Sequence, residues 1–277
     1  MLTKRLDGMG FHVFAGCLSE KGMKELDAET SPNVIPVRLD VTKTECILSA
    51  FDIVKSKLPK DKGLWGVVNN AGIAGAIGPI QWLTKEDYKF ALEVNTLGMI
   101  ETTRIFLPLV LKSKGRIVNI TSMMGRIAAA NPTYVVSKFA AEGYSDVLRR
   151  EMYKRGVTVH ILEPGFFKTP IINTDSINTN IEAKFNQLPK DLQDYYGQPY
   201  SDKLKQTATE VVLKLGSTDL HLVIDAYTHA LTAKYPNYRY IVGNDARFFF
   251  RLMWNLPEWI SDFFLARATQ IPAAEQS

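Results

Sequence analysis

The feature that most constrains the fold is one stretch, residues 119–138, in which the end of a strand, a loop and a helix follow one another closely. The apolar strand covers residues 116–120 and leads into two hydroxyl side chains, the second of which is Ser122. After a loop of small residues, an Asn-Pro pair opens a helix that carries Tyr134 and Lys138. Their i, i+4 spacing puts them on one helix face. A buried strand followed by an amphipathic helix indicates an α/β fold.

The side chains in this stretch suit proton transfer. A tyrosine phenol titrates near ~10 and is a poor base at neutral pH, but a neighbouring ammonium lowers its pKa. Lys138 is placed to do this for Tyr134, and Ser122 to hydrogen-bond the same substrate oxygen. The sequence therefore predicts a site that interconverts an alcohol and a carbonyl. A Tyr and a Lys at this spacing also fit an ordinary solvated helix face, so the prediction needs further elements.

Four elements, in order and spacing, resemble the short-chain dehydrogenase/reductase family: Asn69-Asn70-Ala71-Gly72, Ser122, Tyr134-V-V-S-Lys138 and Pro164-Gly165. The resemblance extends from Met1 to about residue 265. It implies a Rossmann-like, doubly wound parallel sheet in a single domain over residues 1–277. It also implies a catalytic set of Asn95, Ser122, Tyr134 and Lys138, in which Asn95 joins the tyrosine and the lysine through a proton-relay water.

The same resemblance implies cofactor contacts at the ends of strands, made by Asp40, Val41, Asn70, Ala71, Gly72, Tyr134, Lys138, Pro164, Gly165 and Thr169. For Asp40, a contact to adenine and a polar residue before a helix over 42–58 are equally open interpretations. NAD is favoured over NADP because Leu18, Ser19 and Glu20 follow the strand that ends near Cys17. A carboxylate at this place would repel a 2′-phosphate and accept a ribose hydroxyl.

The beginning of the chain departs from the family pattern. Residues 1–7 are typical of the end of a helix, closed by Gly8 and Gly10. In the family, a strand and a T-G-x-x-x-G-x-G turn come before this helix, and the turn places backbone N–H groups against the cofactor's pyrophosphate. We expect the strands beside the missing one to keep unpaired backbone groups, because it would lie at the sheet centre. The sequence therefore predicts an N-terminally truncated domain that folds poorly and binds NAD weakly.

Two segments near the C-terminus carry further expectations. Residues 170–210 are polar, contain Asn, Pro and Gly, and predict an irregular insertion that acts as a substrate lid. Next, Asp219 is expected to cap a helix over 220–233. The aromatic tail over residues 246–265 has two interpretations, which are core packing and a membrane-interface patch with flanking Trp and Arg side chains.

Composition excludes several other classes. The formal charge is +4, and no run of Lys and Arg with interleaved aromatic residues is present, so no nucleic-acid partner is expected. Two cysteines are too few for a disulfide framework, and the four histidines lack metal-ligand spacing, so no metal is expected. We find no apolar run of about 18 residues and expect no transmembrane segment in this chain.

Segments outside the catalytic set resemble the retinol dehydrogenase and hydroxysteroid dehydrogenase branch of the family, at residues 63–72, 146–152, 163–169 and 229–236. This branch acts on bulky apolar alcohols and ketones, and the resemblance implies lipid or steroid metabolism at the endoplasmic reticulum membrane. The apolar faces of the helices over 95–111 and 134–152 are wide enough to pack on a partner subunit, and this contact would form a homodimer. Two alternatives remain open: a catalytically inactive binding protein, and a subunit that contributes only an oligomer face.

Overall fold

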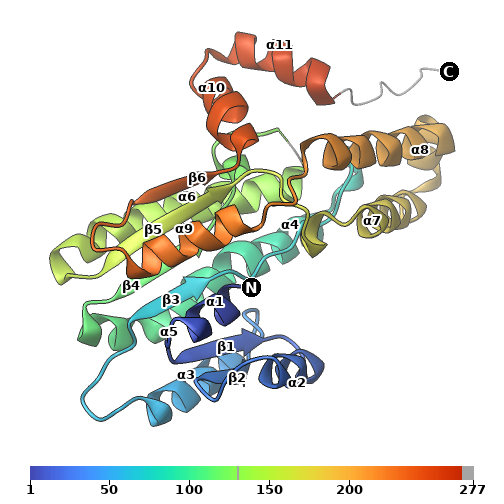
Figure 1. Cartoon of the computed structure of the whole chain (residues 1–277). Coiled ribbons are helices and arrows are strands. Elements are labelled where there is room, and N and C mark those ends of the chain that lie inside the picture. The colour runs from blue at the N-terminus through green and yellow to red at the C-terminus, as the bar shows by residue number, and fades with distance from the viewer. Residues whose placement is uncertain (130, 270–277) are drawn as a thin grey trace.

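The computed structural model describes residues 1–129 and 131–269, with side chains as far as Arg267; Ala130, in the loop of small residues, lies outside the described residues. The described strands pair in parallel and form two sheets (Figure 1). The smaller sheet pairs β1 (Val13–Cys17) with β2 (Val34–Arg38). The larger sheet has the order β3 (Gly66–Asn69), β4 (Arg116–Ile120), β5 (Thr158–Pro164) and β6 (Arg239–Val242).

Helices cover both faces of the larger sheet, which confirms the doubly wound α/β prediction (Figure 1). One face packs against α3 (Thr44–Lys57), α5 (Gly98–Ser113) and α6 (Pro132–Met152). The other face packs against α1 (Leu2–Gly8) and α9 (His221–Thr232). In β4, Ile117 points into the first core and Val118 into the second. Such strands are apolar on both sides because both faces are covered.

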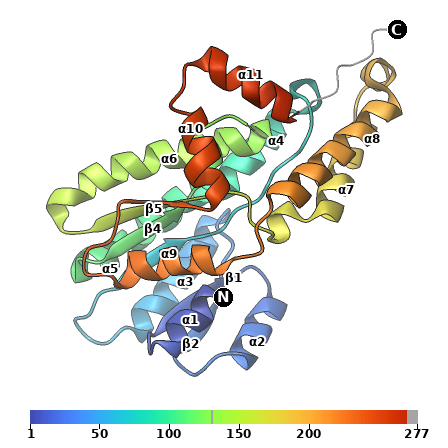
Figure 2. The same cartoon turned by 45° about the horizontal axis from the view of Figure 1, so that its top comes forward.

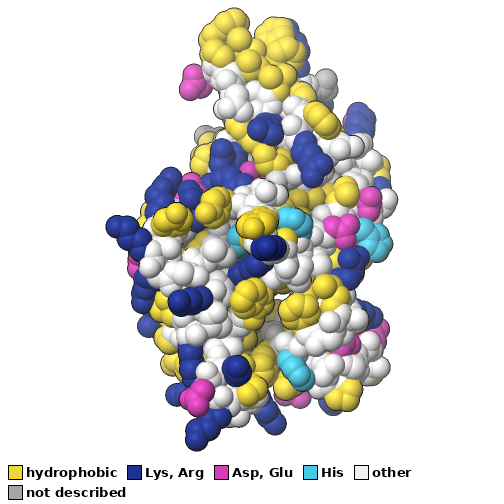
Figure 3. Space-filling view, turned by 60° about the vertical axis from the view of Figure 1, so that its left-hand side comes forward, with side chains coloured by type: hydrophobic (Ala, Val, Ile, Leu, Met, Phe, Trp, Pro, Cys, Tyr) yellow, Lys and Arg dark blue, Asp and Glu magenta, His cyan; other side chains and the backbone are white. Residues whose placement is uncertain are grey.

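Between the two sheets, β1 and β3 each have a free edge. Within the described chain, β1 pairs only with β2, and β3 pairs only with β4. The sheets are nevertheless neighbours, since Phe14 and Val37 pack in the same apolar cluster as Val67. Figure 3 shows a hollow bordered by hydrophobic side chains between the main body and the lower lobe. A free strand edge leaves backbone groups without ladder partners, so this is the place where one more parallel strand would join the sheets.

Helix α4 (Lys85–Leu92) starts with a capping box, in which Thr84 and Asp87 hydrogen-bond each other's backbone N–H. It continues through the π-turn η2 (Glu93–Leu97) into α5. Among the described residues, this helical stretch (Lys85–Ser113) is apolar and long enough to cross a membrane, a length that we did not expect from the sequence. Half of its most apolar window is buried, as in a core helix.

The segment expected to be an irregular insertion is helical, so the prediction of irregular structure is wrong. After the short turn η5 (Pro170–Ile172), α7 (Thr174–Asn186) and α8 (Lys190–Leu215) lie side by side as a hairpin (Figure 2). They enclose an apolar cluster of their own around Trp82. Polar surface residues concealed the helical pattern, and Gly197 does break α8, with φ +71°. The prediction that Asp219 caps α9 is also wrong, because Leu220 is the N-cap residue.

The aromatic tail divides into a buried part and an exposed part, and the tail elements are η6 (Asp245–Phe250), α10 (Arg251–Met253) and α11 (Glu258–Thr269). Ala246, Phe250 and Met253 pack against Met123 and Met124. By contrast, several large apolar side chains of the tail face outward. Core packing therefore accounts for one part of the tail and not for its exposed side chains. The remaining short elements are α2 (Glu20–Ala28), η1 (Ile80–Trp82), η3 (Met123–Gly125) and η4 (Tyr153–Arg155).

Candidate active site

The structure brings Ser122 and Tyr134 together at the carboxyl end of β4. Ser122 follows the strand, is buried, and accepts a hydrogen bond from the Met124 backbone N–H at 3.1 Å. Tyr134 stands in the first turn of α6, which Pro132 opens at its first position. The two hydroxyl groups are hydrogen-bonded. A serine and a tyrosine from two elements thus converge at a strand end, where ligands bind in open α/β sheets.

The pKa of the Tyr134 phenol is raised, not lowered as the sequence argument expected. Burial raises it, because the phenolate is charged and loses solvation, while the hydrogen bond with Ser122 acts in the opposite direction. Lys138 Nζ lies 5.5 Å from the centroid of the Tyr134 ring. In this arrangement the tyrosine is held as the neutral phenol, which is a proton donor.

Lys138 lies beneath the tyrosine and is buried. Its ammonium donates to the Ile120 carbonyl at 3.3 Å. Burial lowers the pKa of Lys138 to about 8, and the nearby Glu142 carboxylate acts in the opposite direction. A Cβ added at Gly72 would lie 3.7 Å from Lys138 Nζ, so the loop after β3 passes directly over the lysine. The absence of a side chain at this position keeps the approach to the ammonium open.

A Lys138→Met variant should be more stable than the wild-type protein at pH 7. The folded-state pKa is about 8 and the ordinary value is 10.5, so the buried charge destabilises the fold below pH 8. The penalty is a few kcal/mol, at about 1.4 kcal/mol for each pH unit between the two values. It fades as the pH rises from about 8 to about 10.5. Urea unfolding from pH 6 to pH 11 would measure it, with the exposed Lys112→Met as control. A difference that does not depend on pH would contradict this account.

Asn95 is fully buried within the π-turn, and its side chain is hydrogen-bonded on both sides. The side-chain amide donates to the Ile73 carbonyl and to Ser137 Oγ, each at 2.9 Å, and its oxygen accepts from the Ile73 N–H at 2.8 Å. The asparagine therefore joins the loop after β3 to α6. Its hydrogen bonds to Ile73 and Ser137 hold Gly72 and Lys138 in place, because each of these two residues is the sequence neighbour of one of the partners.

The residues expected to contact the cofactor's adenosine lie at the end of the smaller sheet. The Asp40 carboxylate accepts from Thr42 N–H at 3.0 Å and from Thr42 Oγ1 at 2.7 Å, which lowers the pKa of Asp40. Lys43, not Asp40, is the N-cap residue of α3. Asp40 thus shapes the turn before the helix. Val41 packs against the backbone of Gly98, where an added Cβ would lie 2.8 Å from Val41 Cγ2.

The remaining expected contacts lie along the carboxyl edge of the larger sheet. Asn70 is tied through its Oδ1 to the Tyr227 hydroxyl at 2.7 Å, and Ala71 beside it is exposed. Gly165 follows β5 and donates its N–H to the Val242 carbonyl at 2.8 Å. Thr169 is the N-cap residue of η5, beyond Pro164 and Gly165 in the chain. These residues form one rim from β3 to β6.

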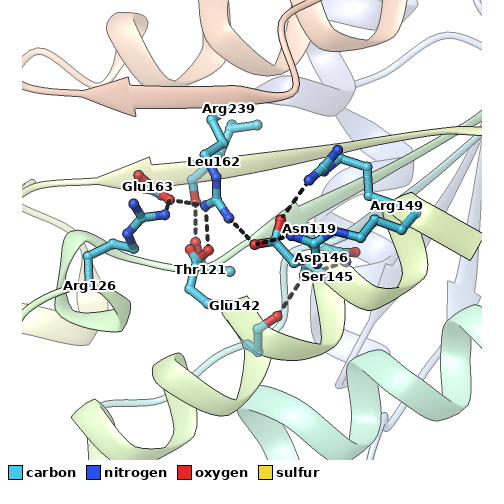
Figure 4. Close-up of polar contacts among 12 residues, drawn as sticks. Asn119, Thr121, Arg126, Glu142, Ser145, Asp146, Arg149, Leu162, Glu163 and Arg239 are labelled. Atoms are coloured by element: carbon cyan, nitrogen blue, oxygen red, sulfur yellow. Dashed lines mark hydrogen bonds and ion pairs between the residues drawn. The ribbon is translucent and has the colours of Figure 1, made fainter.

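Sequence reasoning missed Asp245, which positions this rim. Its carboxylate accepts from the Phe166 N–H at 2.7 Å and occupies the space where a Gly165 side chain would be. It also missed a buried ion network beside β5, in which Arg239 joins Glu142, Asp146 and Glu163 (Figure 4). No spacing in the sequence links β6 to α6. Only the pairing of β5 with β6 brings Arg239 to these acids.

A pocket of ≈ 530 Å³ opens beside the site, between the loop after β3 and the start of α7. Its wall is mostly apolar and includes Gly72, Ile73, Phe90 and Ile177. Helix α7 is fastened over it by an ion pair of 2.5 Å between Lys184 and Asp87. Gly72 contacts both the pocket and the neighbourhood of Lys138. The pocket therefore leads from bulk solvent toward the tyrosine and the lysine.

Comparisons with known proteins agree with this geometry. The family model described as short chain dehydrogenase matches residues 1–180. Retinol dehydrogenase 7 of Rattus norvegicus is 42% identical over 273 residues, covering 99% of this chain and 86% of that protein. Human 17-beta-hydroxysteroid dehydrogenase type 6 is also 42% identical over 273 residues, with the same coverage. A solved short-chain dehydrogenase from Streptomyces avermitilis has a TM-score of 0.72 at 21% identity, covering 97% of this chain and 92% of that one.

Proposed function

This chain belongs to the short-chain dehydrogenase family and is an oxidoreductase by that membership, and we propose that it transfers a hydride between NAD(H) and a bulky apolar alcohol or ketone of the retinol or hydroxysteroid class. The observation that carries the proposal is the convergence of Ser122, Tyr134 and Lys138 at the carboxyl end of β4. These side chains are buried or half-buried, and a low-polarity site strengthens their hydrogen bonds.

Each residue has a distinct task at the reacting oxygen. Ser122 Oγ orients the substrate oxygen by a hydrogen bond, and the Tyr134 phenol gives it a proton during reduction or takes one during oxidation. Lys138 supplies the positive charge that makes deprotonation of Tyr134 less costly. Asn95 holds the loop after β3 against α6, so that Gly72 and Lys138 keep their positions. When bound, NAD supplies or accepts the hydride.

The described residues fit the nicotinamide half of NAD better than its pyrophosphate. Gly72 leaves room for close approach at the sheet rim near Asn70, whereas the space beside Gly165 is filled by the Asp245 carboxylate. At the pyrophosphate position the family has a glycine turn, and among the described residues the strand edges of β1 and β3 stand free instead. The adenosine half would lie by Asp40 and Val41. We therefore expect NAD to bind this chain weakly, because few protein contacts would reach its pyrophosphate.

The pocket beside the site supports an apolar substrate. Its volume of ≈ 530 Å³ lies within the range of roughly 300–1,000 Å³ that is usual for small-molecule pockets. Its walls discriminate retinoid from steroid skeletons only weakly, because apolar surfaces recognise shape loosely. A direct test is to follow NADH formation with all-trans retinol and with a 17β-hydroxysteroid. Turnover of short polar alcohols at the same rate would exclude the proposed substrate class.

We expect the enzyme to prefer NAD to NADP. Helix α2 begins directly after β1, with Ser19 as N-cap residue and Glu20 in its first turn. A carboxylate there repels the 2′-phosphate and can accept a hydrogen bond from the ribose hydroxyl. Steady-state kinetics with both cofactors should give a higher kcat/KM with NAD, and a Glu20→Gln variant should narrow the difference. A kcat/KM at least tenfold higher with NADP would reverse the assignment.

An assembly role is the second candidate function. Leu97 at the end of η2 and Val136, Phe139 and Val147 on α6 are exposed, and such apolar faces favour a homodimer. Sedimentation velocity of the wild-type chain and of a Val136→Ser/Phe139→Ser variant would test this. By resemblance to the branch, the dimer would act at the endoplasmic reticulum membrane.

A further inference from the structure

A second pocket, of ≈ 580 Å³, lies on the other side of β5 from the apolar pocket's loops, between β6 and the tail. We call it the arginine pocket, because four arginines line it together with the buried Glu163 and the aromatic Phe248 and Trp254: Arg126, Arg239, Arg247 and Arg251. The guanidinium of Arg126 lies over the Trp254 ring, 5.6 Å from its centroid. The proposed reaction uses none of these side chains.

The charges in the arginine pocket do not balance. Arg239 is neutralised by Glu142 at 2.5 Å, by Asp146 at 2.9 Å and by Glu163 (Figure 4). Among the described residues, the acidic partner of Arg126 is the same Glu163, at 3.5 Å. The two remaining arginines, Arg247 and Arg251, lie at the rim of the pocket.

Arg247 and Arg251 stand one helical turn apart and are exposed. Among the residues that the structure describes, no carboxylate lies within ion-pair distance of either. Within the described part of the chain, the Arg247 side chain donates one hydrogen bond, from its Nε to the Ile241 carbonyl at 2.9 Å. Deeper in the pocket, Glu163 Oε2 is buried without a hydrogen-bond partner, an arrangement that costs free energy until a donor reaches it. The pocket thus offers free cations at its rim and a free acceptor at its base.

The surroundings of the arginine pocket are apolar and exposed. Phe248 and Trp259 leave 72% and 75% of their surface open, and Leu252 and Phe263 more than half. Figure 3 shows hydrophobic side chains gathered at the top of the molecule, over α10 and α11, with Lys and Arg side chains below them. Exposed aromatic side chains beside arginines are typical of segments that lie in a membrane interface.

We propose that the arginine pocket binds the headgroup of an anionic phospholipid that carries a hydrogen-bond donor beside its phosphate. Arg247 and Arg251 contact the phosphate, and the headgroup donor reaches toward Glu163. The exposed aromatic side chains of η6 and α11 enter the interface around it, so the occupant is a membrane surface and not a soluble anion. This inference does not depend on the proposed oxidoreductase chemistry, because it involves other residues.

Vesicle flotation tests the proposal with the full chain, without cofactor or substrate. The vesicles are phosphatidylcholine alone or phosphatidylcholine mixed with phosphatidylinositol. An Arg247→Gln/Arg251→Gln variant should bind the mixed vesicles roughly 30-fold more weakly, as expected for two arginines near an anionic surface. Phe248→Ser/Leu252→Ser should bind both kinds of vesicle more weakly. All four side chains are exposed, so circular dichroism melts of the variants should match the wild type.

The matched control removes two charges elsewhere. Lys57 and Lys60 are exposed and lie at and just after the end of α3, far from the tail (Figure 1), so Lys57→Gln/Lys60→Gln should leave vesicle binding unchanged. An equal loss in this control would overturn the proposal in favour of nonspecific attraction. Complete competition by millimolar inorganic phosphate would overturn it in favour of a free-anion site. Equal binding of wild type to the two kinds of vesicle would exclude headgroup recognition.

Discussion

Extending the chain before Met1 by a β-strand and a T-G-x-x-x-G-x-G turn is expected to convert a weak, broad thermal transition into a cooperative one and to tighten NAD binding. The reason is the pair of free edges on β1 and β3. A central parallel strand would supply ladder partners and bury apolar side chains on both faces. One large core side chain contributes about 2–5 kcal/mol, against a whole-domain stability of about 5–15 kcal/mol, so several together decide whether the domain folds.

Two extended chains separate packing from phosphate binding. One carries the intact glycine turn, and the other has the glycines replaced by alanine, which blocks the approach of backbone to pyrophosphate. Both should melt cooperatively, but only the first should bind NAD tightly and oxidise retinol or a hydroxysteroid. The stabilisation that NAD adds grows only with the logarithm of its concentration over Kd, so the 277-residue chain gains little from it. A cooperative melt and comparable NAD affinity in the 277-residue chain would refute this prediction.

In the extended chain, Tyr134→Phe should lower kcat by about 10²–10⁴-fold, the usual contribution of a positioned acid or base. The phenylalanine fills the same half-buried space but has no proton to exchange with the substrate oxygen, and it loses the hydrogen bond with Ser122. Affinity for NAD should remain measurable, because the ring carries little of the binding energy.

A second tyrosine on α6 provides the control for this substitution. Tyr144 is also half-buried, but it packs in the core under the sheet, away from Ser122. Tyr144→Phe should therefore keep kcat close to wild type. Rapid-quench kinetics at saturating NAD would measure the chemical step in both variants. Wild-type kcat in Tyr134→Phe would remove the tyrosine from the mechanism.

The lysine could be placed from the sequence, but its electrostatics could not. The i, i+4 spacing puts Tyr134 and Lys138 on one face, and the structure keeps them there. The direction of the Tyr134 pKa depends on how much water the surrounding loops exclude, which no local pattern records. Nor could the sequence show that the Asn95 side chain joins the loop after β3 to α6.

Periodicity predicted the strands and the helices of the doubly wound core, since each apolar stripe reports the face that it buries. The positions of β3 to β6 along the chain and the nearness of Ser122 to Tyr134 follow from local signals, whereas the order of the strands in the sheet is set by their pairing. The helical hairpin of α7 and α8 was missed because its stability comes from Trp82, about a hundred residues away, and not from its own polar sequence. Local interactions can be predicted from neighbouring residues in the sequence, whereas the partners of a packed surface cannot.

The sequence alone determined the family pattern, and from that pattern it predicted the catalytic set of Asn95, Ser122, Tyr134 and Lys138. Only the tertiary structure decided that Arg247 and Arg251 have no acidic partner among the described residues. It also decided that Asp245 supports the rim at Gly165 and that Arg239 joins three acids. These contacts join β5 and α6 to segments some 80 to 100 residues later. Their energies depend on distance and burial, which arise only when β6 pairs with β5 and the tail folds back over α6.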